Sequence, residues 1–156
     1  MTDKPHGKGW LFAAQKGALI GLVGGLLSGP LILAWLLIEC SLKIYSPAGG
    51  SLFFVPFLGA GSLTLVGVSL GACAGGIIGA SGIRLRNVRA STLFGMALLG
   101  GIGTLWVSHI YLSAPPDVKY SASLLIGELI VAPLVAGAAA GALVGKAGIR
   151  LPGRSA

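Results

Sequence analysis

Three ionisable side chains lie in or beside long apolar stretches of this sequence, where charge is costly to bury: Glu128, His109 and Glu39. Glu128 is the strongest candidate, because it lies seven residues past Ser121, about 10 Å along a helix, in an otherwise uncharged stretch. Glu39 and His109 are expected at similar or shallower depth, so the three side chains could converge. A carboxylate–imidazole cluster of this kind suits proton or cation handling, or a polar pocket for a lipid headgroup or a quinone.

A structural interpretation of the same three residues stays open. Glu39 and His109 would then extend to the polar headgroups, and Glu128 would hydrogen-bond a neighbouring helix. The two interpretations differ in whether the carboxylate has to change its protonation state.

Catalytic and metal-binding motifs are absent or accidental. Gly67-Val-Ser-Leu-Gly matches an esterase pattern, but it lies inside a regular series of glycines and not between a strand and a helix. Gly145-Lys146-Ala147 lacks the Ser or Thr and the glycine spacing of a phosphate loop. Two histidines and two separate cysteines give no metal-ligand spacing. We therefore expect no enzyme activity, no cofactor and no metal.

The elements that must position these residues follow from composition. The 156 residues are 54% hydrophobic and only 10% charged, and 27 are glycine. Four uncharged tracts are each long enough, or nearly so, for the roughly 20 apolar residues that cross a bilayer. The sequence predicts an all-α polytopic membrane protein with one transmembrane domain and four spans, near residues 13–40, 58–83, 90–112 and 121–147.

The basic residues predict the orientation of these spans. Nine Lys and Arg residues fall on the side of the two termini and only two, Lys43 and Lys119, on the other. The positive-inside rule therefore places both termini in the cytoplasm or the mitochondrial matrix, in a bacterial cytoplasmic membrane or a mitochondrial inner membrane. The first apolar run is too long for a cleaved signal and is expected to be a retained span.

The net charge of +7 does not come from a basic run, which argues against a nucleic-acid partner. Anionic lipid headgroups are the expected partners of a basic rim on the terminal side, although most of these residues also serve simply as the topology signal. The rim consists of Arg84, Arg86, Arg89, Lys146, Arg150 and Arg154.

Glycine recurs at every fourth position in three of the spans, which leaves one face of each helix without side chains. Another helix backbone can approach such a face closely, as in a glycine zipper. Pro30 and Pro133 interrupt two spans and should each kink a helix or free a carbonyl. Cys40 and Cys73 differ too much in depth to form a disulfide. The helix-packing glycines are Gly17, Gly21, Gly25, Gly29, Gly67, Gly71, Gly75, Gly79, Gly137, Gly141 and Gly145.

An internal repeat connects the second and fourth spans. A shift of 66 residues aligns 61–85 with 127–151, and both segments end in Gly-Ile-Arg-Leu. A weaker match joins 21–25 to 97–101 in the first and third spans. Each half would then be a two-helix hairpin, and the halves would be parallel repeats about an axis along the membrane normal. Biased composition is the alternative explanation.

Four spans in 156 residues, with Gly17-x3-Gly21-x3-Gly25 in the first, resemble the mitochondrial translocase-type family of preprotein and amino-acid transporters. That family includes a four-helix accessory subunit of respiratory complex I. The resemblance covers 17–148 and implies a transport or accessory role. The family's Arg followed four residues later by Asp is absent, since the corresponding positions hold Val88, Ala90 and Leu93. Bacterial four-span proteins fit the same pattern.

Two functions follow as hypotheses. The first is a helix-packing accessory or scaffold subunit of a larger membrane complex or of a homo-oligomer, held by the glycine faces. The second is a small transporter or channel that uses Glu128 with His109 and Glu39.

Overall fold

The structure is a computed structural model that describes residues 9–42, 51–81, 85, 87–113 and 126–147. Every regular element in this part of the chain is a helix. The elements are α1 (Gly9–Ser41), α2 (Ser51–Ala80), α3 (Val88–Ser113), the π-helical turn η2 (Gly127–Val131) and α5 (Ala132–Lys146). Four segments are long and apolar enough to cross a membrane, which confirms the predicted all-α multi-pass membrane protein: Gly9–Ser41, Pro56–Ala80, Val88–Ser113 and Gly127–Lys146.

The helix bounds differ from the predicted spans chiefly in the second and fourth helices. Residues 52–58, expected to precede the second span, belong to α2, which continues through Pro56. Helix is favoured there because an apolar environment offers the backbone no other hydrogen-bond partners. The predicted start of the fourth span at Ser121 lies outside the described residues. Helix α1 likewise runs without a break through Pro30.

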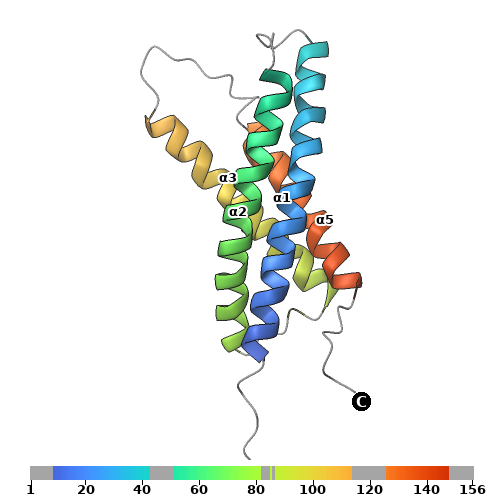
Figure 1. Ribbon diagram of the computed structural model, residues 1–156, viewed down its shortest axis with the longest axis vertical. Helices are drawn as coiled ribbons and strands as arrows, with labels where there is room; N and C mark the ends of the chain where they lie inside the picture. Colours follow the sequence, from blue (N-terminus) through green and yellow to red (C-terminus); the bar gives the residue numbers. More distant parts are fainter. Residues whose placement is uncertain (1–8, 43–50, 82–84, 86, 114–125, 148–156) are drawn as a thin grey trace, which may run out of the picture.

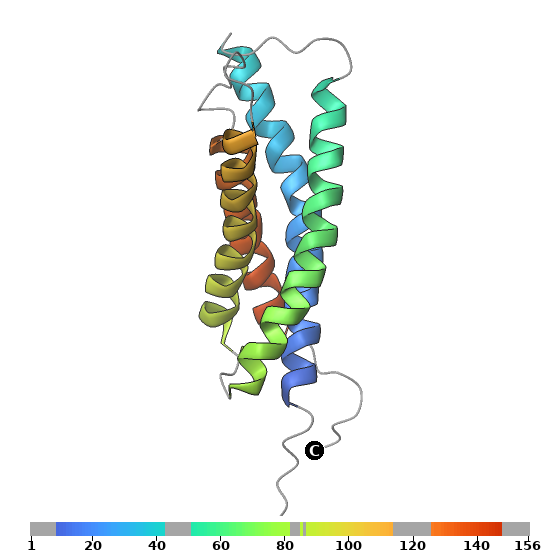
Figure 2. The same cartoon turned by 90° about the vertical axis from the view of Figure 1, so that its left-hand side faces the viewer.

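The helices form two antiparallel hairpins, α1 with α2 and α3 with η2 and α5. Helix α1 packs most extensively on α2, and α3 on α5. Figures 1 and 2 show the first hairpin along the long axis of the molecule, with α3 and α5 on one side of it and the C-terminal end of α3 turned away from the other helices. We name the two ends of the bundle by their charged residues: the basic end holds Lys16, Arg89 and Lys146, and the acidic end holds Glu39 and Glu128.

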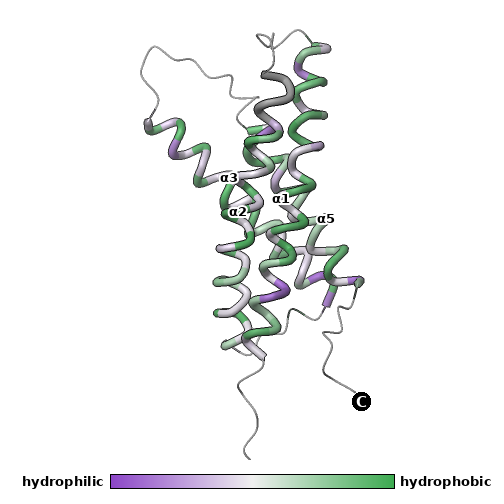
Figure 3. The backbone as a smooth tube through the Cα atoms, in the orientation of Figure 1, coloured by the Kyte–Doolittle hydropathy of each residue, from purple (hydrophilic) through white to green (hydrophobic). Residues whose placement is uncertain are grey.

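The core is small and aliphatic. Ile32, Leu36, Leu63, Leu99 and neighbouring residues of α3 and α5 form its larger cluster, and Ile20 packs with α5 nearer the basic end. Large apolar side chains such as Leu65 and Ile77 are exposed on the outside. Figure 3 shows hydrophobic residues on all sides of the helices, as expected of a bundle surrounded by lipid.

Helix backbones touch one another at glycine positions in both hairpins. A Cβ atom added to Gly17 would collide with the carbonyl oxygen of Gly71, and one added to Gly21 with that of Gly67. Gly95 and Gly137 block each other in the same way between α3 and α5. No residue with a side chain fits at these crossings unless the helices move apart.

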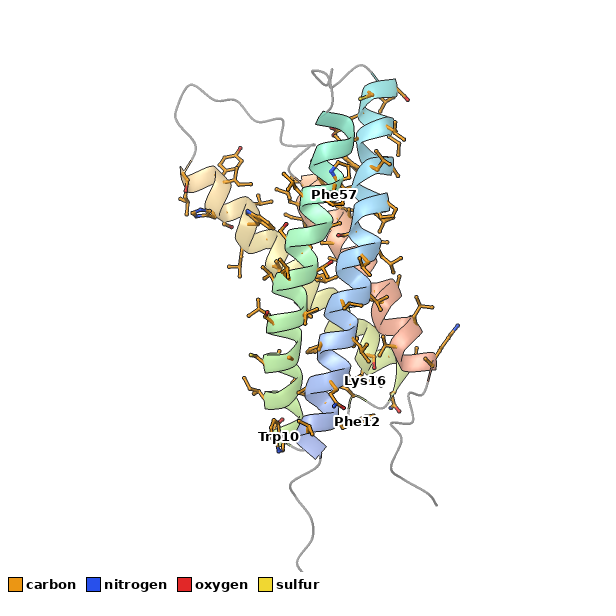
Figure 4. All side chains as sticks on the ribbon, viewed as in Figure 1. Trp10, Phe12, Lys16 and Phe57 are labelled. Atoms are coloured by element: carbon orange, nitrogen blue, oxygen red, sulfur yellow. The ribbon has the colours of Figure 1, made fainter. Side chains whose placement is uncertain are left out.

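A buried lysine connects three elements at the basic end. Lys16 Nζ donates to the carbonyl oxygen of Leu85, and Ser91 Oγ donates to the same oxygen over 3.2 Å. All three residues are buried. The turn between α2 and α3 is therefore bonded to α1, and Figure 4 shows Lys16 near this end, above Trp10.

Candidate functional site

Glu39 is buried at the acidic end, on the last turn of α1. Its side chain is only 2% exposed. Trp35, one turn earlier on the same helix, donates a hydrogen bond from Nε1 to Glu39 Oε1 over 3.0 Å. The second oxygen, Oε2, is buried and has no hydrogen-bond partner among the described residues. The hydrogen bond from Trp35 fixes the carboxyl group and leaves one oxygen unpaired.

Glu128 lies close to Glu39, on the π-helical turn that precedes α5. It is 4% exposed, and its Oε1 is likewise buried without a partner in the described part of the chain. Gly127, the residue before Glu128, lies against the ring of Trp35, and Trp35 donates to Glu39, so the two carboxyl groups lie in the same part of the bundle. We call Glu39 and Glu128 the carboxyl pair. A shared apolar site holding two such groups is rare, because each charge alone is expensive to bury.

The π-helical turn determines which residues face the pair. Along α5 the buried positions recur every four residues, at Ala132, Ala136 and Ala140. One turn before Ala132 the spacing widens to five residues, because the Ala132 N–H donates to the carbonyl of Gly127. In a regular α-helix the position of Gly127 would be taken by Glu128, which is four residues before Ala132. The wider turn therefore places Gly127 and Glu128 against α1.

Pro133 explains why the turn is wide. Proline has no N–H to donate to the carbonyl four residues earlier, that of Leu129, and its ring crowds that carbonyl. π-helical turns often form where such a bond is missing, and they recur at functional sites. The Leu129 carbonyl lies against Gly103 of α3, where a Cβ atom would collide with it. The carbonyl that Pro133 was predicted to free is therefore that of Leu129, and it fits against α3 because residue 103 has no side chain.

Gly127 completes the site by packing on the indole ring of Trp35. A Cβ atom at Gly127 would overlap the ring. Trp35 is therefore held between η2 and Glu39, and its contacts join both halves of the carboxyl pair. Its spacing of four residues from Glu39 was the signal that could have placed it here.

His109 is not brought to the carboxyl pair. It is exposed on the diverging end of α3 (Figure 1), and its ring nitrogen Nδ1 lies 3.5 Å from Ser113 Oγ, one turn further along the same helix. Of the three residues expected to converge, the structure brings together two.

The other predicted site residues are the basic rim, the packing glycines and the two cysteines. In the basic rim, Arg89 and Lys146 are exposed at the basic end, whereas Arg84, Arg86, Arg150 and Arg154 lie outside the described residues. Each predicted packing glycine has an atom of another helix within 4 Å of an added Cβ. Cys40 and Cys73 are both free, as expected.

Apolar residues separate the carboxyl pair from the basic end. Leu36 and Ile32 lie below Glu39 on α1, Ala132 and Ala136 lie below Glu128, and Leu99 of α3 fills the space between the helices. None of the described helices carries an Asp, Glu, Lys, Arg or His in this middle layer. In the described residues, no ionisable side chain therefore lies between the carboxyl pair and Lys16.

The helices alone define the class, a multi-pass membrane protein with four candidate spans. Comparison with protein families, with curated proteins and with solved structures finds no match.

Proposed function

We propose that this chain is a small membrane transporter that binds a proton or another cation at the carboxyl pair. The proposal rests on the two buried carboxyl oxygens without partners. Leaving a buried polar atom unpaired costs about 1–3 kcal/mol, and more when the group is charged. A bound positive ion would remove this cost and would give the pair a function.

The apolar layer below the pair supports a transporter over a channel. A channel needs a continuous polar path, whereas a transporter exposes one site to each side in turn. The apolar middle of the bundle fits a state in which the site belongs to the acidic end alone. Glu39 and Glu128 lie on different hairpins, so movement between the hairpins would change their separation.

Replacing Glu128 by glutamine tests this function. Glutamine keeps the shape and the polar capacity of the side chain but cannot titrate. We expect the variant to fold and assemble like the wild type and to lose at least ten-fold in proton or cation flux, measured in liposomes with the purified full-length chain.

Asp117→Asn, outside the predicted spans, is the matched control and should keep full flux. Equal flux in wild type and Glu128→Gln would reject the transporter. Absence of flux in the wild type, together with purification in fixed ratio with other membrane proteins, would favour the second candidate below.

The second candidate is an accessory or scaffold subunit of a membrane complex or homo-oligomer, without enzyme activity. It is supported by α2, of which only 22% of the span is buried, against 50% for Gly127–Lys146. An open apolar groove of about 280 Å³ also lies between α2 and α3, lined by Val66, Leu70, Ile102, Leu105 and Trp106. Against it, the packing glycines are occupied within the chain and are not free for a partner.

We propose further that the glycine contacts are zippers and that the hairpins are duplicated. Gly71 and Gly137, 66 residues apart as the alignment requires, each meet a glycine of the first helix in their hairpin. Those partners, Gly17 and Gly95, are 78 residues apart, and so are Ala13 and Ser91, which meet Gly75 and Gly141. The weaker sequence match of the first helices used a shift of 76, so the contacts suggest a register two residues longer.

The orientation is proposed from the basic residues, with both termini on the cytoplasmic or matrix side and anionic lipid at the basic end. A reporter fused at either terminus or inserted at Asn87 should lie on one side of the membrane, and one at Gly49 or Asp117 on the other. Protease or alkylation access in intact cells measures this. A terminus on the outside would reverse the assignment.

A further inference from the structure

Each side chain of the carboxyl pair has one buried oxygen without a hydrogen-bond partner in the described residues. These oxygens are Glu39 Oε2 and Glu128 Oε1. An ionised carboxyl group only accepts hydrogen bonds, so two ionised groups give these oxygens no donor. The site would then contain two buried like charges that repel each other. Neither the packing nor Trp35, whose N–H already serves Glu39 Oε1, offsets this.

A single proton changes this balance. A carboxyl group that keeps its proton carries no charge and adds one O–H donor to the site, so one of the two buried charges is removed and the group that stays ionised gains a potential donor nearby. We propose that the carboxyl pair holds one proton shared between Glu39 and Glu128, and that a proton, not a metal cation, is the ion this site binds. The inference rests on the proposed function, because it names the ion of the same site.

Divalent metal cations suit the site poorly. Calcium takes six to eight oxygen ligands and magnesium six, usually from several carboxylates, carbonyls and waters. The pair supplies two unpaired oxygens, and the described residues contain no group of three His, Cys, Asp or Glu side chains that could hold a metal. A proton needs only two oxygens.

Among the described residues, the titratable groups near the carboxyl pair include no cation. On α1, half-buried Cys40 follows Glu39, and on α3 His109 and Tyr111 are exposed. The described residues of α2, η2 and α5 add no other Asp, Glu, His, Lys, Arg or Tyr at the acidic end. The described cations Lys16, Arg89 and Lys146 all lie at the basic end. No described cation near the carboxyl pair could therefore neutralise a second negative charge there.

Infrared spectroscopy of the full-length chain in liposomes tests the proposal. A protonated carboxyl group absorbs separately from a carboxylate, and its band shifts in heavy water. The sequence has only four acidic residues, Asp3, Glu39, Asp117 and Glu128, so the band can be counted. At pH 7 we expect the intensity of one protonated carboxyl per chain, unchanged in Asp3→Asn and Asp117→Asn and lost in the double variant Glu39→Gln/Glu128→Gln.

Each other result would overturn the inference. No band at pH 7 would mean two carboxylates, and twice the intensity would mean two separate protons. Loss of the band when choline chloride is replaced by sodium, potassium or calcium chloride would make the site a metal-cation site. If circular dichroism shows that the double variant does not fold, the exchange of choline for metal ions on the wild type still tests whether the site binds a proton or a metal cation. A one-proton band without flux would reject the transporter but leave the shared proton intact.

Discussion

Leucine in place of Gly71 should separate α1 from α2 and lower the free energy of unfolding by about 3 kcal/mol or more, the upper range for overpacked cores. The reason is contact between two backbones. An added Cβ at Gly71 already collides with the carbonyl of Gly17, and this neighbour cannot rotate away as a side chain can. Unfolding in a graded series of dodecyl sulfate, followed by circular dichroism, measures the change. Gly141→Leu should do the same to α3 and α5, because Gly141 lies against the Ser91 carbonyl.

Gly61→Leu is the matched control on the same helix as Gly71. A Cβ atom at Gly61 has no neighbour within 4 Å, so leucine there would extend into open space. Since leucine also favours helix over glycine by nearly 1 kcal/mol, this variant should be as stable as the wild type or more so. Equal losses at Gly61 and Gly71 would mean that these glycines do not hold α1 against α2.

The second large effect is expected from Pro133→Ala. Alanine restores the N–H that the Leu129 carbonyl lacks, so the π-helical turn should close into a regular α-helix. Glu128 would then turn toward the position of Gly127, where the Trp35 ring leaves no room. The carboxyl pair should separate, and flux should fall at least ten-fold while the helix content stays unchanged.

The emission of Trp35 reports this change directly. The chain has three tryptophans, so Trp10→Phe/Trp106→Phe leaves Trp35 alone, and we expect its emission to shift when Pro133 is replaced. Pro30→Ala is the matched control, because Pro30 lies exposed within α1 and away from the pair. An unchanged flux and emission in Pro133→Ala would mean that the proline does not maintain the site.

The four helices could be predicted because length and apolar composition alone determine whether a segment spans a bilayer. The spacing of the glycines predicts which face of each helix makes contacts. It does not predict which helix packs on that face, because a contact depends on two helices. Gly24 shows the difference: it belongs to no series of four, yet it packs on Leu99.

The sequence predicts the depth of the candidate site residues in the membrane, but not the direction in which each side chain points around the bundle. Counting residues from helix ends places Glu39, His109 and Glu128 at similar heights. It does not place them around the bundle, and the outward turn of α3 leaves His109 exposed. The π-helical turn could not be read from periodicity, because one proline is compatible with a kink, a bulge or a wide turn, and contacts with α1 and α3 select among them.

The two hairpins differ in length, and a bilayer of one thickness cannot match both. Helix α1 has 33 residues, about 50 Å at 1.5 Å per residue, whereas α3, the first helix of the second hairpin, has 26 residues, about 39 Å. Figures 1 and 2 show the first hairpin reaching past the second at the basic end, where Trp10 and Phe12 lie beyond Lys16 (Figure 4). Lipid must thicken beside α1 and α2, or that hairpin must tilt, at a fraction of a kcal/mol per Å of mismatch. We therefore expect the acyl-chain length of the host membrane to change the angle between the hairpins, and with it the separation of Glu39 and Glu128.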